Sequence, residues 1–74
     1  MKQVEIFKTD VQEKARANKV LAMLGKKHPD YRVNFDIEDD DRILRVESTT
    51  TQINSIEIES LLEDIGVYCK IFTD

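Results

Sequence analysis

Residues 31–47 read YRVNFDIEDDDRILRVE, an order that describes two strands joined by a tight turn. Every second residue from position 31 to 37 is apolar, the period of a half-buried strand: Tyr31, Val33, Phe35 and Ile37. The acidic run 39–41 has poor strand propensity and predicts the turn. Leu44 and Val46 then resume the alternation. The stretch therefore predicts a β-hairpin.

A strand and a helix are expected before the hairpin. Val4 and Ile6 alternate with Glu5, which predicts a short strand over residues 4–8. Asp10 and Glu13 have the spacing of a capping box, so a helix is expected from about residue 11 to about residue 24. Gly25 would end that helix. Its buried face is expected to comprise Ala17, Val20, Leu21 and Leu24.

A second helix and a last strand are expected after the hairpin. Asn54 and Glu57 form another capping box, and Ile53 can pack on Ile58 as a hydrophobic staple. Gly66 would end this helix. Apolar and other residues alternate over 67–72, which predicts the closing strand.

The order strand, helix, strand, strand, helix, strand defines the expected fold class. Right-handed crossovers return both helices to one face of the sheet. The sequence therefore predicts an α+β, ferredoxin-like βαββαβ two-layer sandwich, with a four-stranded antiparallel sheet and two helices on one face. A length of 74 residues allows one small domain, expected to span residues 1–74.

The alternation also assigns each strand residue to a face of the sheet. The helix-facing set is expected to be Val4, Ile6, Val33, Phe35, Ile37, Leu44, Val46, Val67, Cys69 and Ile71. The solvent-facing set is expected to be Glu5, Phe7, Arg32, Asn34, Asp36, Ile43, Arg45, Glu47, Tyr68, Lys70 and Phe72.

Composition excludes several classes of function. The net charge of −4 argues against nucleic acid or an anionic membrane as the partner, because both attract a basic face. No apolar run approaches the ~20 residues that a spanning helix needs, and no apolar stretch follows Met1 and Lys2, so neither a membrane span nor a secretory signal is expected. A single cysteine cannot form a disulfide within the chain, so a reducing, cytoplasmic location is expected.

Two short motifs point to a known family. Val20 and Leu24 form a Val-x-x-x-Leu pair in the first expected helix, and residues 65–68 read Ile-Gly-Val-Tyr before the last expected strand. With these motifs the chain resembles, over nearly its whole length, the heavy-metal-associated domains of copper chaperones and metal-transporting ATPases. That family binds copper through two cysteines of a GMTCxxC loop at the start of its first helix.

The resemblance places Val11 at the family's buried methionine, and Glu13 and Arg16 at its two metal cysteines. Soft monovalent copper selects sulfur ligands, and a guanidinium repels the ion. We therefore expect a degenerate metal site with no cofactor, in which Glu13 and Arg16 form an intrahelical ion pair instead.

Cys69 and His28 are the remaining candidates for chemistry. Cys69 alternates with Val67 and Ile71, as a buried small apolar residue would, and as a lone thiol it could ligate a metal. His28 follows the first expected helix and is expected to stabilise its C-terminal end, although a histidine can also bind metal. No partner for either stands at a spacing that suggests a catalytic dyad, so no enzyme activity is expected.

The solvent-facing apolar residues give the main functional hypothesis. Phe7, Ile43, Tyr68 and Phe72 would form a partner-binding patch ringed by charge. We therefore expect a small interaction or regulatory module that binds a protein partner or a second copy of itself.

Two alternatives stay open at the level of sequence. One is a divergent metal-binding or metal-transport protein that holds copper or zinc through Cys69, His28 or carboxylates. The other is a regulatory domain that senses a small ligand, since such domains share this order of elements.

Overall fold

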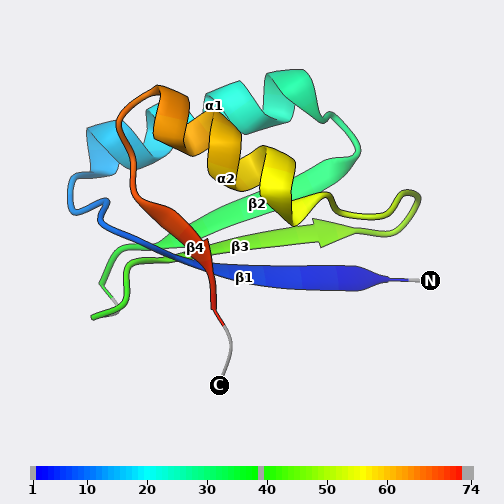
Figure 1. The fold of residues 1–74 in the computed structure, drawn as a ribbon, viewed down its shortest axis with the longest axis horizontal. Helices are drawn as coiled ribbons and strands as arrows, with labels where there is room; N and C mark the ends of the chain where they lie inside the picture. The colour runs from blue at the N-terminus through cyan, green and yellow to red at the C-terminus, as the bar shows by residue number, and fades with distance from the viewer. Residues whose placement is uncertain (1, 39, 73–74) are drawn as a thin grey trace.

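The structure, a computed structural model, describes residues 2–38 and 40–72. Along this part of the chain the elements are β1 (Gln3–Thr9), α1 (Lys14–Lys27), β2 (Tyr31–Asp36), β3 (Ile43–Ser48), α2 (Ser55–Asp64) and β4 (Cys69–Ile71). The strands form one antiparallel four-stranded sheet in the order β2-β3-β1-β4. Both helices cover the same face of that sheet (Figure 1). The predicted ferredoxin-like fold is confirmed.

The core lies between the helix layer and the central strands. Phe7, Leu44 and Val46 on β1 and β3 are completely buried, as are Val20 and Leu24 on α1. The rest of the buried apolar set comprises Val11, Ala17, Ile53, Ile58, Leu62, Val67 and Cys69. Because α1 packs on β2 and α2 on β4, each crossover buries one half of the sheet.

The predicted facing of β1 is wrong. Phe7 is 0% exposed and pairs with Leu44 on the helix side, whereas Val4 is 42% exposed on the opposite side with Ile6. Side chains alternate between faces, so a strand that buried Val4 and Ile6 would also bury the Lys8 ammonium. The observed facing buries Phe7 instead and leaves Lys8 free to pair with Asp41, Nζ to Oδ1, at 3.4 Å.

Glu5 and Thr9 share the helix-facing side of β1 with Phe7. Glu5, assigned to the solvent face from sequence, pairs with Val46 and is half-buried. The buried hydroxyl of Thr9 donates a hydrogen bond to the carbonyl of Arg42 at 2.6 Å and accepts one from the amide of Val11 at 3.2 Å. Glu5 is therefore only half-buried, and the buried hydroxyl of Thr9 has hydrogen-bond partners.

Helix α1 begins and ends later than the sequence predicts. Its N-cap is Glu13, whose side chain makes no capping hydrogen bond, so the predicted capping box with Asp10 is wrong. The Asp10 carboxylate accepts instead from the amide of Tyr68 at 3.1 Å. Gly25 lies inside the helix, and His28 forms the C-cap by donating its amide to the carbonyl of Leu24 at 2.8 Å.

Helix α2 follows most of its sequence signals, although the predicted capping box is only half formed, because the amide of Asn54 donates to the hydroxyl of Tyr31 and not to Glu57. The side chain of Asn54 accepts from the amide of Glu57 at 3.1 Å, and Ile53 and Ile58 are both buried in the core. Gly66 has a φ of +80°, and the amides of Gly66 and Val67 donate to the carbonyls of Glu63 and Leu62, each at 2.9 Å. These bonds form a Schellman motif, which ends the helix at the predicted glycine.

The hairpin and the last strand are shorter than predicted. Strand β2 ends at Asp36 and β3 begins at Ile43, and of the expected turn residues Asp39 lies outside the described part of the chain. Arg42 has a φ of +50° and donates from Nη1 to the carbonyl of Ile37 at 2.7 Å. Strand β4 contains only Cys69–Ile71, so Tyr68 precedes it rather than forming part of it.

Candidate functional site

The open face of the sheet, which we define as the face turned away from both helices, carries an apolar patch. Ile6 on β1 lies beside Phe72, whose amide donates to the Ile6 carbonyl at 2.7 Å. Ile43 on β3 lies diagonally from Ile6, because Ile6 pairs with Arg45, and both line one hollow of about 230 Å³. Val4 lies two residues before Ile6 on the same face. The open-face patch is therefore Val4, Ile6, Ile43 and Phe72.

Only two of the four residues expected in a partner-binding surface belong to this patch. Ile43 and Phe72 belong to it, whereas Phe7 is buried in the core and Tyr68 lies before β4 with half of its surface exposed. Val4 and Ile6 were missed because the alternation of β1 was assigned to the opposite face. Lys8, on the same face as Val4 and Ile6, is the signal that could have revealed them.

Basic side chains surround the open-face patch. On the described strands, this face carries Lys8, Arg32, Arg45 and Lys70 against the carboxylates of Asp36 and Glu47. Glu47 in turn pairs with Lys2, Oε1 to Nζ, at 3.6 Å. The open face is therefore basic although the whole chain carries a net charge of −4.

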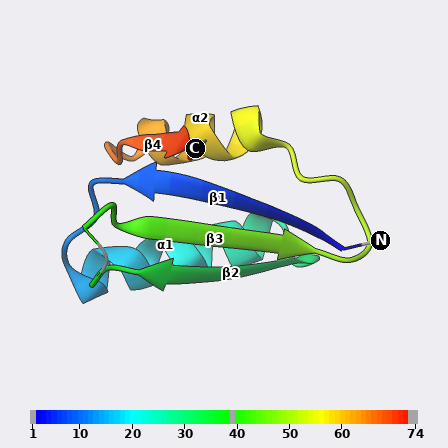
Figure 2. The same cartoon turned by 90° about the horizontal axis from the view of Figure 1, so that it is seen from below.

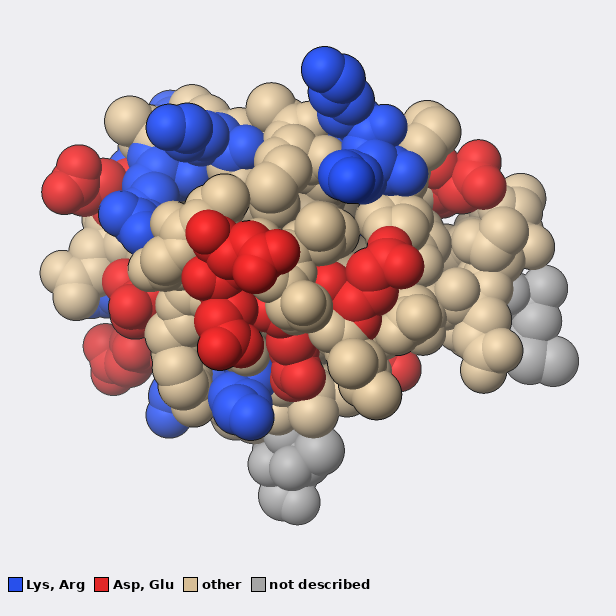
Figure 3. Space-filling view, turned by 45° about the horizontal axis from the view of Figure 1, so that its top comes forward, with Lys and Arg blue, Asp and Glu red and all other residues tan. Residues whose placement is uncertain are grey.

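The acidic charge lies largely elsewhere on the molecule. Helix α2 contains Glu57, Glu59, Glu63 and Asp64 and no basic residue, whereas α1 contains five basic residues and no acidic one within Lys14–Lys27. In Figure 3 these charges form separate blue and red zones over the helix layer. A charged partner would therefore be attracted to one part of the surface and repelled from another.

The guanidinium of Arg16 and residue Glu13, which the resemblance aligned with the two metal cysteines, lie at the ends of two different helices. Arg16 donates from Nη2 to the carbonyl of Gly66 at 2.9 Å and to that of Ile65 at 3.5 Å, so it caps the C-terminal end of α2. Glu13 is the N-cap residue of α1. The expected ion pair between them is not among the contacts of the described residues, since the guanidinium reaches across to α2.

Cys69 is a buried thiol. Its surface is 7% exposed, and burial, with a smaller contribution from the charge of Glu59, raises its pKa to about 12. The thiolate is the nucleophilic and metal-binding form, so this environment suppresses both reactions near neutral pH.

His28 links the two helices instead of standing alone in a loop. Its Nε2 pairs with the carboxylate of Glu57, and its ring stacks on Tyr31 with centroids 4.5 Å apart and planes 13° apart. The hydroxyl of Tyr31 donates to the carbonyl of Gln52 and accepts from the amide of Asn54, each at 3.3 Å. The cluster holds the end of α1 against the start of α2.

No metal site emerges from these groups. Within residues 2–38 and 40–72, no three His, Cys, Asp or Glu side chains are grouped so as to hold a metal ion. The carboxylates of Asp36 and Glu47 also lie apart from each other. Asp36 is opposite Ile43 at one end of β3, and Glu47 is opposite Arg32 near the other end.

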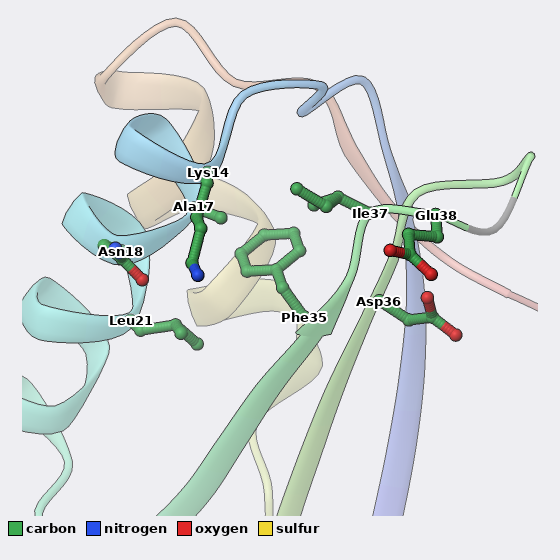
Figure 4. Close-up of a pocket in the computed structure, with 8 residues that line it drawn as sticks. All are labelled: Lys14, Ala17, Asn18, Leu21, Phe35, Asp36, Ile37 and Glu38. Atoms are coloured by element: carbon green, nitrogen blue, oxygen red, sulfur yellow. The ribbon is translucent and has the colours of Figure 1, made fainter.

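A second hollow lies between α1 and β2, with a volume of about 300 Å³. Figure 4 shows Leu21, Phe35 and Ile37 turned toward it, with the Lys14 ammonium nearby and the carboxylates of Asp36 and Glu38 turned away. This hollow follows the outer margin of the sheet, where β2 has a neighbouring strand on one side only.

Comparisons of the chain with protein-family models, curated proteins and solved structures found no match. None of the described helices is both long and apolar enough to cross a membrane.

Proposed function

We propose that this chain is a non-enzymatic protein-interaction module that binds its partner through the open face of the sheet. The observation that carries the proposal is the contiguous placement of Val4, Ile6, Ile43 and Phe72 on a surface that no helix covers. Exposed apolar patches that are bordered by charged residues mark contact surfaces in proteins. The basic rim favours a partner whose own apolar surface is flanked by carboxylates.

Single-stranded nucleic acid fits this face less well. Bases bind to open sheets by stacking on aromatic side chains of the central strands. The adjacent central residues here are Ile6 and Arg45, and Phe72 is the open face's aromatic residue within the described chain. The patch therefore offers apolar contact rather than a stacking platform.

The proposal is tested with Ile6→Ser, which removes the centre of the patch. A partner captured by the wild-type chain and then purified should bind Ile6→Ser at least about tenfold more weakly by calorimetry, because a central apolar contact is lost. Ile56→Ser is the matched control, since Ile56 is 77% exposed on α2, away from the open face.

Equal binding by Ile6→Ser and the wild-type chain would contradict the proposal. So would binding that is lost in Ile56→Ser and kept in Ile6→Ser, because the helix layer would then be the interface.

A further inference from the structure

The two edges of the sheet differ in how their backbone groups are satisfied. Figure 2 shows β4 at one edge and β2 at the other. On the short β4, the amide of Ile71 donates to the Glu59 carboxylate at 2.8 Å, so a side chain caps that edge. Strand β2 is twice as long, and within the described chain no side chain caps residues 32–36. Uncapped edges of this kind are templates for pairing with another strand.

The hydrogen-bond pattern identifies the backbone groups that point outward from β2. Ile6 bonds toward β4, because its carbonyl accepts from Phe72, and Thr9 bonds toward β3, because its amide donates to Arg42. Successive residues of an antiparallel strand bond to opposite sides, so Phe7 and its pairing partner Leu44 bond to each other.

The same alternation gives the direction of the backbone hydrogen bonds on β3 and then on β2. Since Leu44 bonds toward β1, Ile43 and Arg45 bond toward β2, where they pair with Asp36 and Asn34. The backbone groups of Val33 and Phe35 therefore point to the free edge. The amide of Tyr31 agrees with this phase, because it donates to His28 rather than to β3.

The free edge also leaves apolar surface uncovered. Val33 and Phe35 on the helix side of β2, and Ile37 just after it, are only half-buried, whereas Leu44 and Val46 on the neighbouring strand are completely buried. The hollow between α1 and β2 runs along this margin (Figure 4). An added strand would cover these side chains and satisfy the outward backbone groups at the same time.

We infer that the free edge of β2 pairs with β2 of a second copy of this chain, antiparallel and about a two-fold axis at Asn34. This register places Val33 opposite Phe35 of the second copy, so that their outward amides and carbonyls bond to each other. It also places Arg32 opposite Asp36 of the second copy, twice by symmetry. The product is an eight-stranded sheet with four helices on one face.

The charges of Arg32 and Asp36 favour a second copy of this chain as the partner of the β2 edge, and they also favour the register with the axis at Asn34. In the described chain neither Arg32 nor Asp36 belongs to an ion pair within 4 Å, and both are exposed on the open face. Moving the axis to Val33 or Phe35 keeps the backbone bonds but places Arg32 or Asp36 opposite Asn34, which loses the charge pairs. The strand is thus self-complementary in backbone, apolar side chains and charge at one register.

Sedimentation equilibrium and amide hydrogen exchange test the inference on the purified wild-type chain. We expect a monomer–dimer equilibrium, with amides of Val33 and Phe35 becoming protected as the protein concentration rises. The amides of Arg32 and Asn34, which bond to β3, should be protected at every concentration. A chain that stays monomeric throughout, or a dimer that leaves Val33 and Phe35 unprotected, would overturn the inference.

Charge reversal tests the register. Arg32→Asp and Asp36→Arg should each weaken the dimer about tenfold, because two symmetric pairs change from attraction to repulsion. The double variant should restore the affinity of the wild-type chain. Lys70→Asp is the control, since Lys70 lies on the same face at the opposite edge. A double variant that stays as weak as the single variants would contradict the register.

This edge is distinct from the open-face patch, so the two proposals fail separately. The Ile6→Ser variant should dimerise as the wild-type chain does, because β3 separates β1 from the free edge of β2. Loss of the dimer in Ile6→Ser would place the self-association on the open face and overturn the β2 pairing. Assembly of β2 with an added extended peptide but not with itself would overturn the choice of occupant.

Discussion

Cys69 begins β4 with its thiol turned into the core, where burial and the carboxylate of Glu59 raise its pKa from 9.0 to about 12. At pH 8 the native thiolate population is therefore far smaller than in an unfolded chain. We expect an aromatic disulfide reagent to react at least ~100-fold more slowly with the native protein than with the protein in urea. Equal rates would show that the thiol is accessible.

The same pKa shift predicts a pH dependence of stability. The neutral thiol favours the folded chain, so its contribution is complete below pH 9, the unfolded pKa, and is lost as the pH rises from 9 towards 12. Urea unfolding should therefore show the wild-type chain losing more stability than Cys69→Ala over that interval. The difference between the two chains isolates the thiol from lysine and tyrosine titration.

The two glycines differ in what their backbones require. Gly66 has a φ of +80° in the turn that ends α2, whereas Gly25 lies within α1 and a Cβ added there meets nothing within 4 Å. Gly66→Ala should lower the free energy of unfolding by about 1 kcal/mol, and Gly25→Ala should raise it by about 0.5–1 kcal/mol. Urea unfolding of the two variants measures both effects, and equal signs would contradict the assigned conformations.

At the scale of the elements, the two helices begin in different ways. Asn54 caps α2 through its side chain, whereas Glu13 at the start of α1 makes no such bond. Asn54→Ala should therefore cost about 1 kcal/mol of stability by thermal unfolding. Glu13→Ala is the matched control and should cost much less. A larger loss in Glu13→Ala would mean that its carboxylate caps α1 in solution.

The facing of β1 is also a property of an element, and the core of the whole molecule depends on it. Phe7 touches both the sheet centre and the helix layer, and a chain of 74 residues has a total stability of only about 4–11 kcal/mol. Phe7→Ala should cost about 3–5 kcal/mol, whereas Val4→Ala on the open face should cost less than about 1 kcal/mol. The midpoint of urea unfolding distinguishes the two variants. A larger loss of stability in Val4→Ala than in Phe7→Ala would support the facing predicted from sequence.

The whole molecule presents three different surfaces. The helix layer carries the charges of α1 and α2, the open face carries the apolar patch with a basic rim, and the β2 edge carries unpaired backbone groups. Arg16 and His28 both contact the second crossover, Arg16 at the carbonyl of Gly66 after α2 and His28 at Glu57 in α2. A substitution on β1 such as Ile6→Ser should therefore leave the free edge of β2 and the helix layer intact.

Local sequence signals determined much of this architecture. The order of elements, the hairpin, and both ends of α2 follow from features that act within a few residues, such as the Asn54 cap and the Gly66 turn. Such signals work from sequence because the groups that satisfy each backbone amide or carbonyl are neighbours along the chain.

Tertiary structure decided what depends on residues far apart in the chain. The facing of β1 was fixed by burying Phe7 and leaving Lys8 outside, and α1 lost its predicted cap because Asp10 bonds to Tyr68. Arg16, read beside Glu13 in sequence, bonds to carbonyls about fifty residues away in the chain. The open-face patch and the free β2 edge are equally nonlocal, because strand order and facing arise only when the sheet assembles around one shared core.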